Sequence, residues 1–284
     1  MYDEEEKDIW YKLGNIDVRW MVLACILLIF VPLIRPIGLP TLVSEPTKDF
    51  YHAIVDLPPG SVIAVSFGAG FGALDEREAQ FIATFKTIFE TDVKLMVYCY
   101  SSEGPMVLER IIAEGTGIAD PLKYGKVYGE DYVRLGYAPL GEPGEATMVA
   151  DIRSIFSTDY KGTPLDEIPM MEDINNADDI DLLWADYGSC TDIEWYIRQW
   201  VVPTHTPVIA TMLGCCAPMA APYYPDQCVG FLSGSGMGTE MEIISKNPGP
   251  GARTSDIKNL AILPFLLFLI LGNISAFGKR YLKR

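Results

Sequence analysis

The sequence predicts an α/β domain with an open, mostly parallel sheet between two layers of helices, carried between two transmembrane helices. Three observations favour this fold class. Short apolar runs alternate with helical patterns through the middle of the chain. Two longer uncharged runs lie near the two ends of the chain. Apolar residues make up 49% of the 284 residues although 21% are charged, which indicates that the apolar residues are segregated in the sequence.

The first uncharged run covers residues 20–34 and is bounded by Arg19 and Arg35. At about 1.5 Å per residue it is short for a hydrocarbon core of about 30 Å, but the snorkelling stems of the two arginines extend it. A cleaved signal peptide has a basic start and a small-residue cleavage site, whereas this chain begins MYDEEEKD. We therefore expect an N-terminal tail over residues 1–19 and an uncleaved transmembrane helix over residues 20–35. A buried helix is the alternative.

The second uncharged run, residues 260–277, precedes a dense group of Lys and Arg residues. It predicts a transmembrane helix over residues 259–278 and a basic tail over residues 279–284 that stays in the cytoplasm. Both termini are then cytoplasmic, and the domain between the spans, residues 36–258, is extracytoplasmic at a prokaryotic cell membrane. This domain carries 32 acidic and 14 basic side chains. Its acidity disfavours binding to anionic headgroups and to nucleic acid.

The domain is expected to begin its sheet with a buried strand over residues 61–67, which follows Pro58-Pro59-Gly60. The next apolar positions have helical spacing, with acidic residues in the first turn, and predict a helix over residues 74–91. The same alternation predicts strands over 93–100, 132–137, 180–185, 208–212 and 229–232, and helices over 105–114, 146–156, 193–201 and 237–245. This order is typical of Rossmann-like and flavodoxin-like sheets.

Residues 157–179 interrupt the alternation with Pro, Gly and several acids, and we interpret them as one long solvated insertion. The acids match no calcium-loop pattern. Arg153 is close in sequence to Asp159, and the two are expected to form either a structural ion pair or part of a polar site.

Two glycine-rich turns are the candidate cofactor-binding elements. Gly68, Gly70 and Gly72 follow the first strand in the pattern G-x-G-x-x-A, in which glycines let the backbone approach a pyrophosphate at a helix N-terminus. Acids in the following helical turn would repel phosphate, and no acid stands at the end of the second strand to bind a ribose. Gly234, Gly236 and Gly238 form a second such turn after the last strand. The alternative, which we favour, is that both are plain chain reversals without a cofactor.

The remaining polar residues give no catalytic or metal signature. There is no G-x-S-x-G motif, and His52 and His205 are the only histidines. Cysteines at the expected strand ends lack C-x-x-C spacing, so we expect no metal site. In an oxidising compartment they are instead candidates for at least one disulfide, with Cys216–Cys228 preferred. The four candidates are Cys190, Cys215, Cys216 and Cys228.

Asn273 lies within the second uncharged run, where a polar side chain commonly bonds to another helix. It predicts contact with other membrane subunits or with copies of this chain. The segments LIRPIGLP after the first run, FSTDYKGTP in the middle and LGNI in the second run complete a layout that resembles uncharacterised prokaryotic membrane proteins with a double-anchored α/β domain. This resemblance implies the fold and the topology but no activity.

These observations favour a non-enzymatic docking or assembly subunit of a larger membrane complex, without a cofactor. The alternatives are a small-ligand or nucleotide-binding sensor that uses the two glycine-rich turns, and an enzyme whose polar residues converge only in the folded chain.

Overall fold

The computed structural model describes residues 9–282 and divides into two compact units. One unit, Thr41–Gly251, is the α/β domain. The other combines the described parts of Met1–Pro40 and Ala252–Arg284. Parts of the two expected terminal tails, residues 1–8 and 283–284, lie outside the described residues.

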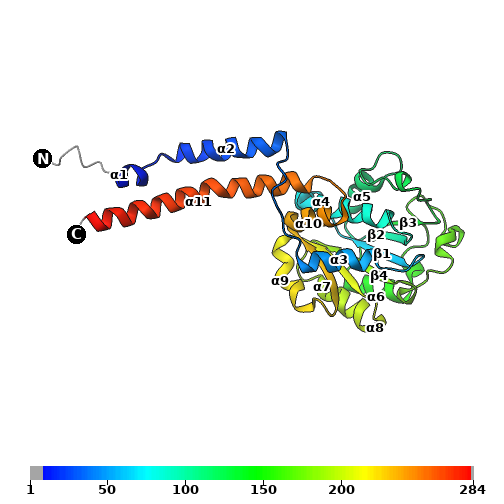
Figure 1. Ribbon diagram of the computed structural model, residues 1–284. Helices are drawn as coiled ribbons and strands as arrows, with labels where there is room; N and C mark the ends of the chain where they lie inside the picture. Colours follow the sequence, from blue (N-terminus) through cyan, green and yellow to red (C-terminus); the bar gives the residue numbers. More distant parts are fainter. Residues whose placement is uncertain (1–8, 283–284) are drawn as a thin grey trace. The chain divides into compact units, whose positions relative to one another are not determined.

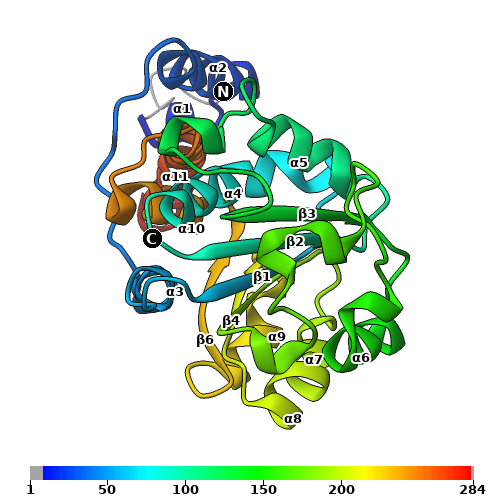
Figure 2. The ribbon, with the colours of Figure 1, turned by 90° about the vertical axis from the view of Figure 1, so that its right-hand side faces the viewer.

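The domain is built on a six-stranded sheet in which every pairing between neighbouring strands is parallel. Its strand order is β3-β2-β1-β4-β5-β6, the order of Rossmann-type sheets rather than of flavodoxin-type sheets. The structure has a strand at each of the six predicted positions, which confirms them, and Figure 2 labels all of these strands except β5. Their bounds are Val62–Phe67 (β1), Lys94–Cys99 (β2), Tyr132–Tyr137 (β3), Leu182–Tyr187 (β4), Val208–Met212 (β5) and Cys228–Ser233 (β6).

One face of the sheet is covered by four helices: α3 (Glu45–Val55), α4 (Leu74–Phe89), α5 (Gly104–Ile112) and α10 (Gly234–Ser245). Phe81 and Phe85 of α4 pack against Trp184 of β4, with ring centroids 6.5 and 4.8 Å from the Trp184 ring. Burying such large aromatic side chains is a main source of stability for this face. Helix α3 had no counterpart in the predicted elements.

The opposite face is covered by α6 (Glu142–Ala150), by the helical segment Ile193–Thr204 and by α9 (Ala217–Ala220). The segment Ile193–Thr204 consists of α7 (Ile193–Tyr196), a π-helical turn (Ile197–Val201) and α8 (Val202–Thr204). Helix α6 begins four residues before the predicted start at residue 146, and residues 152–154 form a separate 3₁₀ turn.

The insertion at residues 157–179 is not a solvated loop, which corrects the expectation from its acidic composition. It contains the 3₁₀ turns Leu165–Glu167, Pro169–Met171 and Ala177–Asp179. Its apolar side chains are buried in the core of the same face as α6: Leu165, Ile168, Met170, Met171 and Ile174. Most of its acids are exposed to water, namely Asp166, Glu167, Glu172, Asp173 and Asp178, whereas Asp159 is buried. The apolar residues between them complete the core.

Arg153 fixes this insertion, and its expected pairing with Asp159 is wrong. Its Nε donates to Asp166 Oδ1 at 2.8 Å, and its Nη atoms donate to the carbonyl oxygens of Met171 at 2.8 Å and Ile174 at 2.9 Å. Asp159 instead accepts a hydrogen bond from the hydroxyl of Tyr128 at 2.7 Å. Arg153 therefore has a structural role.

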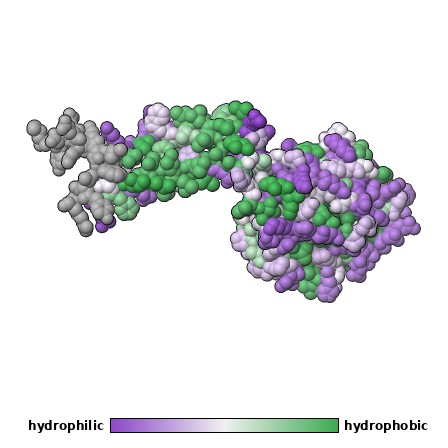
Figure 3. Space-filling model, viewed as in Figure 1, coloured by the Kyte–Doolittle hydropathy of each residue, from purple (hydrophilic) through white to green (hydrophobic). Residues whose placement is uncertain are grey.

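The second unit contains α1 (Ile9–Gly14), α2 (Val18–Ile34) and most of α11 (Gly251–Leu282), as labelled in Figure 1. Within α11, the 28 residues Gly251–Gly278 are long and apolar enough to cross a membrane. Helix α2 has 17 residues and falls short of the about 20 residues that a span needs. Both helices expose apolar side chains along most of their length, seen as green surface in Figure 3.

Asp256, near the start of α11, holds the chain that follows α2. Its carboxylate accepts the backbone N–H groups of Ile37 at 2.7 Å, Gly38 at 2.9 Å and Leu39 at 2.9 Å. Three N–H donors on one carboxylate fix the conformation of this short segment.

Candidate functional site

The carboxyl edge of the sheet is the place where ligands bind in open parallel α/β folds, and it holds every residue proposed above for cofactor binding. The strand order reverses between β1 and β4, so the turns after these strands flank the point at which a crevice forms in such folds. The first glycine-rich turn follows β1, and Cys190 lies in the loop after β4.

The first turn is packed against the protein's own side chains. A Cβ atom at Gly68 would overlap the hydroxyl of Tyr100 and would lie 2.6 Å from the carbonyl oxygen of Asp186. A Cβ atom at Gly70 would lie 2.7 Å from Glu103 Oε2, whereas Gly72 faces open space. Glycine is therefore required at Gly68 by internal packing, independently of any ligand.

Glu103 occupies the position at which a phosphate would bind in a dinucleotide-binding turn. Its Oε2 accepts the backbone N–H of Phe71 at 2.6 Å, at the start of the 3₁₀ turn that leads into α4. A helix start binds phosphate through such N–H groups. With a carboxylate on this donor, a second anion is repelled, and this observation disfavours nucleotide binding at Gly68, Gly70 and Gly72.

The second turn joins β6 to α10 and packs beside the turn after β5. Gly234 has a φ of +64° and would place a Cβ atom 3.1 Å from Glu76 Oε1 and 3.3 Å from the Cα atom of Gly214. Glu76 also accepts the N–H of Gly214 at 2.8 Å. Gly238 packs against Ala79 of α4, and Gly236 faces open space. Glu76 thus connects the start of α4 with the turns after β5 and β6.

A buried ion pair lies beneath these turns. Arg77 of α4 is 1% exposed and Asp186 of β4 is 0% exposed, and Arg77 Nη1 is 2.7 Å from Asp186 Oδ1. Thr211 Oγ1 donates to the same carboxylate at 2.9 Å, and the N–H of Gly68 donates to it at 3.2 Å. Burial raises the pKa of Asp186, and Arg77 opposes this rise as the main charge partner. The pair ties β4, β1 and α4 together at the switch point.

On the other face, Glu145 of α6 is buried beside β1. Its carboxylate accepts hydrogen bonds from Ser66 Oγ at 2.8 Å, Tyr98 Oη at 2.8 Å and Trp200 Nε1 at 3.0 Å. Burial raises the pKa of Glu145, and these three donors oppose the rise. Sequence reasoning missed this residue, because the predicted helix began at residue 146 and an isolated Glu near a helix start is ordinarily a solvated residue that favours the helix dipole.

Asp192, in the loop after β4, is also buried. Its Oδ2 lies 3.5 Å from Tyr100 Oη, and its Oδ1 has no hydrogen-bond partner among the described residues. Burial raises the pKa of this carboxyl. An unpaired buried carboxyl oxygen costs free energy unless it is protonated or bound to a donor.

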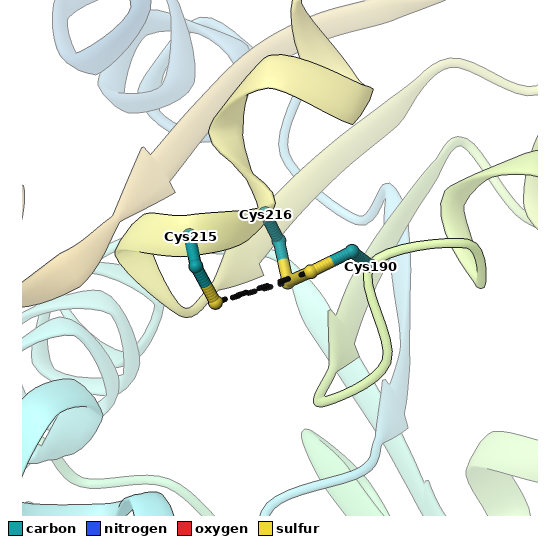
Figure 4. Close-up of side chains that lie close together, drawn as sticks. All are labelled: Cys190, Cys215 and Cys216. Carbon is teal, nitrogen blue, oxygen red and sulfur yellow. Dashed lines mark hydrogen bonds between the residues drawn. A yellow bond between two sulfur atoms is a disulfide. The ribbon is translucent and has the colours of Figure 1, made fainter.

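The four candidate cysteines separate into a group of three and one distant member. Cys190 forms a disulfide with Cys216, so the preferred Cys216–Cys228 pair is wrong. Cys228 is buried at the start of β6, at the opposite end of that strand from its carboxyl edge. Cys215 is an exposed thiol whose Sγ lies 4.0 Å from Cys190 Sγ and 3.9 Å from Cys216 Sγ (Figure 4).

Comparisons with known proteins found no matching family model, no matching curated protein and no matching solved structure.

Proposed function

We propose that the chain is a double-anchored, non-enzymatic membrane subunit whose α/β domain docks to other subunits outside the cytoplasm. The support for anchoring is the 28-residue apolar segment Gly251–Gly278 of α11. In this proposal α2 is the second anchor. Its 17 residues rise about 26 Å at 1.5 Å per residue, and the snorkelling side chains of Arg19 and Arg35 extend it toward the headgroups.

The proposal depends on contact between α11 and other transmembrane helices. The observation that supports this contact is Asn273, whose amide is exposed inside the apolar part of α11. Its Nδ2 donates to the carbonyl oxygen of Leu269 at 2.9 Å, one helical turn back. This bond uses one of the two N–H groups of the amide. Lipid offers no partner for the second N–H or for the side-chain oxygen, whereas a neighbouring helix does.

The carboxyl edge of the sheet also supports docking over nucleotide binding. Glu103 already occupies the phosphate-binding N–H at the first turn. Large apolar side chains near this edge are exposed, namely Phe71, Met106, Tyr137 and Met219. Exposed aromatic and Met side chains are enriched in protein interfaces.

The assembly proposal is tested by the mass of the native particle in mild detergent. We expect a particle larger than one 31.5 kDa chain with its micelle, and a shift toward that smaller mass in Asn273→Leu. Ile270→Leu, at another exposed position of α11, is the matched control and should leave the mass unchanged. A native particle of one chain refutes assembly. A large particle that is unchanged by Asn273→Leu refutes the role of Asn273 and leaves the domain as the contact surface.

The topology is tested by protease added to spheroplasts. The proposal expects loss of the domain with both termini protected, as detected by tags at the two ends. Digestion of the domain only after lysis reverses the topology.

A second candidate function, a small-ligand sensor, is favoured by Asp192, whose buried Oδ1 has no partner among the described residues. A ligand with an amine or hydroxyl donor satisfies such an oxygen. In a thermal-shift screen, a ligand at 100 times its Kd adds about 2.7 kcal/mol of stability. A compound that stabilises the wild type but not Asp192→Ala supports the sensor, and the absence of any such compound supports docking.

A further inference from the structure

Three cysteine sulphur atoms converge at the carboxyl ends of two neighbouring strands. Cys190 lies in the loop after β4, and Cys215 and Cys216 lie in the 3₁₀ turn Gly214–Cys216 after β5. Strands β4 and β5 pair in parallel, so their carboxyl ends meet at one edge of the sheet. Figure 4 shows the side chains of Cys215 and Cys216 pointing toward Cys190. All three Sγ atoms lie within 4.8 Å of one another.

The distances from Cys215 to the other two sulphur atoms suit a shared metal ion. They are 3.9 Å to Cys216 and 4.0 Å to Cys190. Metal–thiolate bonds of about 2.3 Å place sulphur atoms about 3.8 Å apart in tetrahedral geometry and about 4.0 Å apart in trigonal geometry. Cys215 already has this spacing, and only the bonded pair Cys190–Cys216 must separate.

From this arrangement we infer that the reduced protein binds a soft d¹⁰ metal cation through the thiolates of Cys190, Cys215 and Cys216. Thiolate ligands select soft cations such as Cu(I) and Zn²⁺ over Mg²⁺ and Ca²⁺. Three protein ligands leave one position of a tetrahedron open, and the site is accessible because Cys215 is exposed. This site revises the expectation of no metal centre, which rested on spacing along the chain.

The disulfide makes metal binding depend on the redox state. A dithiol reductant supplies two electrons and two protons, which convert Cys190–Cys216 into two thiols while the reductant becomes a disulfide. A divalent cation then displaces one proton from each of the three thiols, releasing three protons in all. With the disulfide closed, Cys215 is the single thiol in the group and the site is lost. The chemistry is independent of the assembly role proposed above.

The test uses the full chain in mild detergent and Cd²⁺ as the probe. The protein is reduced with dithiothreitol, desalted under argon and titrated with Cd²⁺, while the ultraviolet thiolate-to-metal charge-transfer band and equilibrium dialysis report binding. We expect one Cd²⁺ per reduced chain, no such band with the oxidised protein, and no displacement by excess Mg²⁺.

Two variants separate the thiol group from other cysteines. Cys215→Ser removes an exposed thiol outside the disulfide and should weaken Cd²⁺ binding about tenfold or more, because one of three ligands is lost. Cys228→Ser is the matched control at a buried cysteine outside the group and should bind as the wild type does. Reduced wild type without a charge-transfer band, or Cys215→Ser with wild-type affinity, overturns the inference.

Discussion

Replacing Arg77 with methionine leaves the buried carboxylate of Asp186 without its cation. The side chains are 1% and 0% exposed, and the two charged atoms are 2.7 Å apart. Breaking a buried pair by removing one partner costs about 3 to 5 kcal/mol, since the remaining charge is uncompensated. For a domain the size of Thr41–Gly251 this loss lowers Tm by roughly 6 to 20 °C.

The effect should also depend on pH. Burial raises the pKa of Asp186, and loss of Arg77 removes the main charge that opposes the rise. A carboxyl with a raised folded-state pKa contributes stability that is fully present below its unfolded pKa and is lost as pH rises through the folded pKa. Arg77→Met should therefore be less destabilising at acidic pH than at neutral pH.

The assay is urea unfolding of the full chain in mild detergent, followed by tryptophan fluorescence at several pH values. Lys48→Met is the control, because the pair Lys48–Glu45 is exposed and should contribute less than about 1 kcal/mol. If Arg77→Met destabilises the domain no more than Lys48→Met does, the buried Arg77–Asp186 pair does not stabilise the domain as argued above. A penalty that grows toward acidic pH contradicts the sign derived above.

Two further predictions concern stability. Glu145→Gln keeps hydrogen-bonding groups beside Ser66, Tyr98 and Trp200 but cannot ionise. Since burial raises the pKa of Glu145, the wild type should lose stability relative to this variant as pH rises above the unfolded pKa of about 4.3. Parallel stability profiles of the two proteins against pH in urea unfolding would contradict this. Gly230→Ala places a Cβ atom 2.5 Å from the Cα atom of Phe50 and should destabilise the domain by about 1 to 3 kcal/mol, because it overpacks α3 against β6. Gly236→Ala lies in open space within α10 and should stabilise the domain by up to about 1 kcal/mol. Equal Tm values for the two variants would refute the packing argument.

The sheet was predictable because buried parallel strands have a local signature. Each strand is a short apolar run between turn residues, and burial on both faces requires that composition. Helix α3 was not predictable in the same way. Phe50 and Ile54 are fully buried, but the contact that buries them lies on β6, where Gly230 lets the helix approach the strand. A glycine about 180 residues away in the sequence gives no local signal.

The candidate site was predicted only in part, because its chemistry depends on how turns from separate strands meet. The glycine-rich turns do lie at the carboxyl edge, yet Glu103 and Tyr100 fill the first one from the turn after β2. The Cys190–Cys216 bond likewise joins the turns after β4 and β5. The short spacing along the chain favoured Cys216–Cys228, but Cys228 begins β6 and therefore lies at the edge of the sheet opposite the carboxyl edge.

Buried carboxylates on both faces of the sheet fix the end of β1. Ser66 donates to Glu145 on one face, while the N–H of Gly68 donates to Asp186 on the other. Each carboxylate also binds a helix on its own face, through Trp200 of the π-helical turn and Arg77 of α4.

Polar networks of this kind hold one arrangement of their partners, because any shift leaves buried groups unpaired. The turns after β1 and β4 therefore start from fixed strand ends, so Asp192 and Cys190, which follow β4, are presented on a rigid base. Binding at this edge, whether of a partner protein or of a metal ion by the three cysteines, then requires adjustment of the turns alone and not of the sheet.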